Sequence, residues 1–103
     1  QLTRLLLDLL KWQYQPQRRS DSWLDSITDA RTQIELAIED SPSLKNYPGE
    51  QLAQSYTRAR QQAVQQTGIS ISSFPEECLY SLNLLLSDWL PVAIVQQIGE
   101  NQT

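Results

Sequence analysis

The sequence predicts an all-α fold: a small bundle of three main helices, with a short fourth helix and an extended arm. Three observations support this prediction. Apolar residues recur at spacings of three and four along most of the chain. Prolines and glycines fall between these periodic stretches and not inside them. One stretch alternates apolar and polar residues as a β-strand would, but the sequence offers no second strand for it to pair with. At 103 residues, the chain is expected to form a single helical domain over residues 1–103.

The first helix is expected over residues 2–15, because Pro16 prevents the helical conformation in the residue before it. Apolar side chains cover roughly two-thirds of its circumference. A helix this apolar belongs in the middle of a bundle, with partners on several faces. Its polar residues share one narrow strip: Arg4, Asp8, Lys11 and Gln15.

The second helix is expected over residues 21–39, with Ser20 or Ser22 as the N-cap. It is amphipathic, and its apolar stripe is expected to cover the first helix. The stripe consists of Trp23, Ile27, Ala30, Ile34 and Ala37, widened by Leu24 and Ile38. Residues 40–49 contain two prolines and form a connector, in which Leu44 and Tyr47 are expected to close the end of the bundle.

The third helix is expected over residues 50–67, followed by Gly68 in the left-handed conformation. Its small alanines allow a neighbouring helix to approach closely. Its apolar face carries Leu52, Tyr56, Ala59 and Ala63.

The stretch 69–75 is the one that alternates apolar and polar residues, and we interpret it as an extended arm. Ile69, Ile71 and Phe74 are expected to lie in the groove between helices. Ser81 can cap a short fourth helix over residues 82–89, and residues 92–103 form a tail.

The chain contains no methionine and begins inside a helical pattern without a capping residue. It is therefore expected to be a fragment that lacks an N-terminal helical segment. The first helix would then have lost part of its cover, and the uncovered surface would be open to a second copy of the chain.

Several short motifs occur in an order and spacing that resemble the bacterial family of domain of unknown function 29 (DUF29), which is abundant in cyanobacteria. They are Leu9–Pro16, Arg18-Arg19-Ser20, Ser22-Trp23, Ser41–Leu44, Tyr56, Ala59-Arg60, Ala63, Thr67–Ile69, Phe74–Cys78 and Tyr80. The resemblance implies an all-helical, cytoplasmic protein with no assigned activity, and a helical segment ahead of the first motif. Two positions depart from the pattern: Asp8 stands where the family often has histidine, and Leu79 where it often has proline.

The composition excludes several kinds of site. The chain has no histidine, so Ser-His, Cys-His and His-metal arrangements are excluded. One cysteine cannot form an intrachain disulfide or a Cys₄ zinc site, and three scattered glycines cannot make a phosphate-binding loop. We therefore expect no catalytic activity, no metal and no cofactor.

The charge and the lone cysteine also bear on partners and location. A net charge of −4 disfavours a broad nucleic-acid interface. A lone thiol fits a reducing compartment, and no apolar run reaches the ~18 residues of a membrane span, so a cytoplasmic protein is expected. Cys78 follows two glutamates, which raise the pKa of a thiol, and it is expected to be a buried structural residue.

One local cluster combines basic and aromatic side chains: Lys11, Trp12, Arg18, Arg19 and Trp23. It could contact a small anion or single-stranded nucleic acid through stacking and guanidinium contacts. Alternatively, the Trp rings fill the core while the arginines bind the last carbonyls of the first helix. Arg31 and Arg60 flank the apolar stripes of their helices and are expected to pair with carboxylates or backbone carbonyls.

Two functions follow from these observations. The first is a small helical interaction module without catalytic activity, which binds a protein partner or a second copy of itself. The alternative is a binder of nucleic acid or an anionic ligand that uses the basic-aromatic cluster.

Overall fold

The computed structural model describes residues 2–43 and 49–92. In these residues the chain forms the helices α1 (Leu2–Tyr14), α2 (Asp21–Asp40), α3 (Gly49–Thr67) and α4 (Leu82–Leu85). The 3-10 turn η1 (Pro16–Arg18) lies between α1 and α2, and η3 (Ile71–Ser73) lies between α3 and α4. The described residues contain no strand. The all-α prediction is confirmed. No helix among them is long and apolar enough to cross a membrane.

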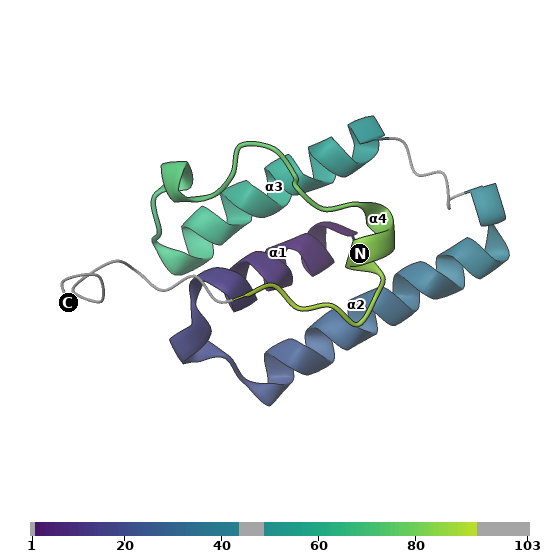
Figure 1. The fold of residues 1–103 in the computed structure, drawn as a ribbon, viewed down its shortest axis with the longest axis horizontal. Coiled ribbons are helices and arrows are strands. Elements are labelled where there is room, and N and C mark those ends of the chain that lie inside the picture. The colour runs from purple at the N-terminus through teal and green to yellow at the C-terminus, as the bar shows by residue number, and fades with distance from the viewer. Residues whose placement is uncertain (1, 44–48, 93–103) are drawn as a thin grey trace.

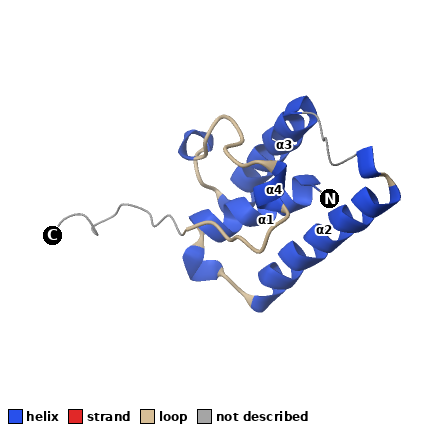
Figure 2. Ribbon diagram, turned by 45° about the vertical axis from the view of Figure 1, so that its right-hand side comes forward, coloured by secondary structure: helices blue, strands red, loops and turns tan. Residues whose placement is uncertain are grey.

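Helix α1 lies between α2 and α3 and contacts both (Figure 1). The α4 turn and the segments on either side of it pass across these helices, as the turned view also shows (Figure 2). The leucines of α1 are therefore all covered: Leu2, Leu5, Leu6, Leu7, Leu9 and Leu10 are each at most 8% exposed. The prediction that part of this helix is uncovered is wrong, because α2, α3 and the residues after Gly68 cover it.

Helix α2 begins where predicted, with the Ser20 side chain accepting a hydrogen bond from the Trp23 amide. Its apolar stripe covers α1 over a shorter length than predicted. Ile27 and Ala30 are fully buried, whereas Ala37 is exposed. The reason is length, because α1 has 13 residues and α2 has 20, so nothing of α1 lies beside the last turns of α2.

Helix α3 packs on α1 as its sequence predicts. Tyr56, Ala59 and Ala63 are at most 1% exposed, so the two alanines bring the helices close together. Gly68 ends the helix with φ +75°, and its amide donates to the carbonyl of Val64 at 2.9 Å.

The arm after Gly68 differs in part from the prediction. Phe74 is buried and meets the ring of Tyr14 edge-on, with 4.7 Å between ring centroids. Ile69 is half-buried, but Ile71 is 45% exposed because the 3-10 turn η3 interrupts the expected alternation. The arm therefore inserts Phe74 into the core and leaves Ile71 in solvent.

Helix α4 is capped by Ser81, as predicted, but it ends at Leu85 and not at residue 89. The Ser87 hydroxyl donates to the carbonyl of Leu84 at 2.6 Å and accepts from the Trp89 amide at 3.2 Å. A serine that binds nearby backbone groups in this way competes with helix continuation. The predictions for Leu44 and Tyr47, and those for residues 93–103 of the tail, lie outside the described residues.

Candidate functional site

The polar strip of α1 faces α2 and forms a ladder of contacts across the interface. Arg4 Nη2 lies 2.7 Å from Asp29 Oδ2. The Ser26 hydroxyl donates to Asp8 Oδ2 at 2.6 Å. We call these two contacts, together with a third at the far end of α1, the polar ladder. They fix the antiparallel register of the two helices, because each pairs one turn of α1 with one turn of α2.

The third contact of the polar ladder belongs to the predicted basic-aromatic cluster. Lys11 Nζ lies 4.8 Å from the centroid of the Trp23 ring and donates to Gln66 Oε1 at 3.1 Å. Lys11 therefore ties α1 to α2 and to α3. Trp23 is half-buried.

Arg19 of the same cluster is also engaged inside the chain. Its Nε donates to the carbonyl of Trp12 at 2.9 Å, and its guanidinium lies 4.5 Å from the centroid of the Trp12 ring. This is the contact with the last carbonyls of the first helix that the structural interpretation predicts. Arg18 is exposed. The structure thus pairs Lys11 with Trp23 and Arg19 with Trp12, and it leaves Arg18 facing solvent.

Arg31 and Arg60 lie away from this cluster and hold the C-terminal part of the chain. Arg31 Nε donates to the carbonyl of Leu85 at 2.7 Å, and its Nη2 donates to that of Trp89. Arg60 Nη2 donates to the carbonyls of Ile71 and Phe74 at 2.8 and 3.1 Å. The expected pairing with backbone carbonyls is confirmed for both.

Burial lowers the pKa of Arg31, and the negative charges of Asp88 and Glu35 act in the opposite direction. These two carboxylates therefore help to keep the buried guanidinium charged. This arrangement allows one side chain to bind two carbonyls from a segment more than fifty residues later in the sequence.

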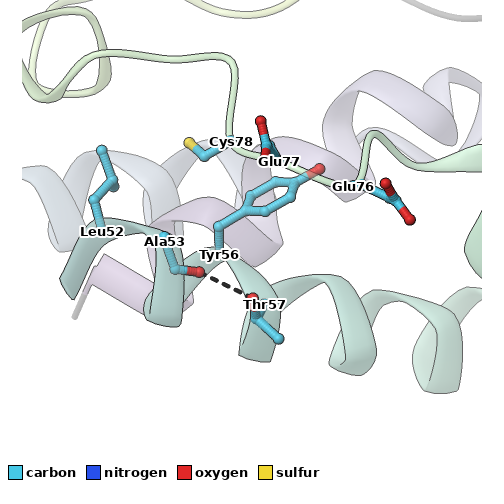
Figure 3. Close-up of a pocket in the computed structure, with 7 residues that line it drawn as sticks. All are labelled: Leu52, Ala53, Tyr56, Thr57, Glu76, Glu77 and Cys78. Carbon is cyan, nitrogen blue, oxygen red and sulfur yellow. Dashed lines mark hydrogen bonds between the residues drawn. The ribbon is translucent and has the colours of Figure 1, made fainter. Parts of the chain in front are cut away.

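A hollow of about 390 Å³ lies between α3 and residues 76–78, which follow the arm, and is lined by Tyr56, Cys78 and five neighbours (Figure 3). The Tyr56 hydroxyl donates to the carbonyl of Pro75 at 2.6 Å, and burial raises its pKa. Burial also raises the pKa of the Cys78 thiol, so at neutral pH the thiol is protonated and a poor nucleophile. Cys78 is half-buried, because this hollow opens beside it, and not fully buried as predicted.

Glu76 and Glu77 lie at the edge of this hollow, are exposed, and point in different directions (Figure 3). Asp21, Asp25 and Asp29 are exposed along α2. Within residues 2–43 and 49–92, no three His, Cys, Asp or Glu side chains gather where they could hold a metal ion.

A second surface feature was not predicted from the sequence. Two hollows of about 300 and 240 Å³ lie between α2 and the segment that contains α4. Glu35 and Leu86 line both of them, so the two hollows are adjacent, and together we call them the α2–α4 groove. Its apolar lining consists of Leu24, Ile38, Leu82, Leu86 and Leu90, and its acidic lining of Glu35, Glu39 and Asp88.

A family model described as "Domain of unknown function DUF29" matches residues 1–90. The chain belongs to the DUF29 family. No curated protein and no solved structure matches it. The resemblance found in its motifs is therefore confirmed, while the family description assigns no activity to compare with the geometry.

Both departures of this DUF29 chain from the motif pattern have a place in the fold. Asp8, the first of them, is 8% exposed and accepts the hydrogen bond from Ser26. Leu79, the second, is 73% exposed in the segment between the arm and α4. Asp8 therefore supplies part of the polar ladder, and Leu79 lies on the surface.

Proposed function

We propose that this chain is a helical protein-interaction module without catalytic activity, which binds a partner polypeptide along α2, at the α2–α4 groove. The observation that supports this is the distribution of apolar side chains on that helix. Leu24 is 38% exposed and Leu36 is 48% exposed, and Leu24 lines the α2–α4 groove. Apolar side chains beside a groove are typical of a surface that another protein covers.

The composition supports the absence of catalysis in this proposal. The chain has no histidine, and its one thiol carries a raised pKa. Neither supplies an activated nucleophile or a general base near neutral pH. In the same proposal, the protein works in the reducing cytoplasm of a bacterium, where its single cysteine stays a thiol.

The alternative function, binding of nucleic acid or an anionic ligand, receives less support from the contacts. Lys11 and Arg19 are committed to Gln66, Trp23 and Trp12, so Arg18 is the exposed member of the predicted basic set. One exposed arginine supplies little of the phosphate contact that such binding needs.

Site-specific photo-crosslinking in the native cells tests the interaction module. Benzoylphenylalanine in place of Leu24, within the full-length protein, is expected to form a covalent adduct with a polypeptide. The matched control carries it in place of Arg58, which is exposed on α3. Adducts at both positions, or at neither, contradict the proposal. Light scattering on the purified chain shows whether the adduct is with a second copy.

A further inference from the structure

We propose that the α2–α4 groove binds a cationic amphipathic segment of the partner protein, with leucine-like side chains in the groove and Lys or Arg along its edges. This inference rests on the proposed function and adds the chemistry of the partner.

The groove presents apolar walls on both sides. Leu24 and Ile38 line it from α2, and Leu82, Leu86 and Leu90 line it from α4 and the residues after it. Its two hollows lie along α2 on either side of Glu35 and Leu86, which line both. Successive apolar side chains of a partner helix, spaced three and four residues apart, fit such a row of hollows.

The accessible charge of the groove is negative. Glu35, Glu39 and Asp88 line it and are exposed. Its one basic residue, Arg31, is buried and donates to two backbone carbonyls beneath the surface. A partner therefore meets carboxylates around an apolar floor, which is complementary to a segment that is both apolar and basic.

The other charged residues of α2 make the surroundings of the groove more negative. Six acidic residues and one arginine give α2 a net charge of −5, whereas the whole chain has −4. A symmetric dimer across this face would place two such helices together and is disfavoured by repulsion. Nucleic acid and other polyanions are disfavoured for the same reason. The remaining occupant that matches both the leucines and the carboxylates is a basic amphipathic segment.

Three synthetic helical peptides test this proposal by fluorescence anisotropy at low and at physiological salt. The first carries leucines at spacings of three and four with lysines beside them. The second replaces the lysines with glutamates, and the third keeps the lysines and replaces the leucines with glutamines. We expect the purified chain to bind the first peptide, more weakly as salt is added, and to bind the other two at least about tenfold more weakly.

A pair of charge variants locates the site. Glu35→Gln with Glu39→Gln is expected to weaken binding of the leucine–lysine peptide by roughly three- to tenfold at low salt. The matched control, Glu76→Gln with Glu77→Gln, removes the same charge from exposed residues at the other hollow. It is expected to leave binding nearly unchanged. Thermal melts of both variants establish that each remains folded.

Three outcomes overturn the inference: no binding of the leucine–lysine peptide, equal binding of the leucine–glutamate peptide, or equal losses in the two variant pairs. The crosslinking at Leu24 separates this failure from a failure of the proposed function. A crosslinked partner whose contacting segment is acidic or uncharged leaves the proposed function standing and overturns the inference. Absence of any crosslinked polypeptide overturns both.

Discussion

The interface between α1 and α3 and the interface between α1 and α2 use different chemistry on the same helix. On the α3 side, Tyr56, Ala59 and Ala63 are at most 1% exposed and pack into a continuous apolar core. On the α2 side, the polar ladder runs beside a short apolar stripe centred on Ile27 and Ala30. The α1–α3 interface depends on apolar packing, and we expect the polar ladder to select one register of α1 and α2 among those that leucines alone would permit.

This difference explains why α2 keeps an exposed outer face. The leucines of α1 are covered by several elements at once, so α2 does not need to bury all of its own apolar residues. Leu24 and Leu36 remain accessible on α2, and α3 carries no comparable exposed leucine among the described residues. The helix with the weaker apolar attachment is thus the one that presents the candidate binding surface.

The largest effect is expected from Leu9→Ala, which removes a core side chain on the side of α1 away from the polar ladder. Leu9 is 1% exposed, and its truncation should lower the free energy of unfolding by roughly 2–5 kcal/mol. Chemical denaturation measures the loss. The control Leu36→Ala, at a residue 48% exposed, should change stability by less than about 0.5 kcal/mol. Similar losses in the two variants would show that the assignment of α1 as the core helix is wrong.

A smaller effect is expected from Ala59→Leu, which tests the close approach of α1 and α3. Ala59 is 0% exposed, and a larger side chain there should separate the helices at a cost of about 1–3 kcal/mol. Ala53→Leu is the matched control, because Ala53 is exposed on the same helix. The thermal midpoint of the control should stay close to that of the parent chain. A stable Ala59→Leu variant would mean that this interface is not closely packed.

The smallest effect is expected from Ser26→Ala, which removes the donor to Asp8 in the polar ladder. The loss should be about 1 kcal/mol, at the low end for a buried acceptor that loses its donor, because 8% of Asp8 remains exposed to water. Replacing both partners, with Asp8→Leu and Ser26→Ala together, should recover much of this loss, since no polar group is then left unpaired. Denaturant midpoints of the three chains provide the comparison. A loss for Ser26→Ala as large as that for Leu9→Ala would remove the distinction between the two interfaces.

Features set by local sequence were predictable. The caps Ser20 and Ser81, the left-handed Gly68, and the buried face of α3 depend on residues within one or two turns of each other. The partner of the polar strip was not predictable, because it depends on which helix lies along that strip. The early end of α4 was also missed, since the hydrogen bonds of Ser87 oppose the helical pattern of its leucines.

The candidate site was predicted only in part. The contact of Arg19 with the end of α1 follows from their closeness in the chain, and it was predicted. The α2–α4 groove was not, because its walls come from residues 24–39 and 82–90, which are distant in sequence. Two features of the sequence pointed to it: the excess of carboxylates on α2, and Leu24 and Ile38, which widen its apolar stripe.

The hydrogen bonds of Arg31 and Arg60 to the C-terminal segment bear on the order in which the chain folds. Arg31 binds carbonyls 54 and 58 residues further along, whereas Arg60 binds carbonyls 11 and 14 residues further along. Closing a long loop costs more chain entropy than closing a short one, so we expect the Arg31 contacts to form late in folding. We expect the three long helices to form the nucleus and the final third of the chain to join them last. The same segment should be the first to detach when the protein unfolds, and with it one wall of the groove is lost.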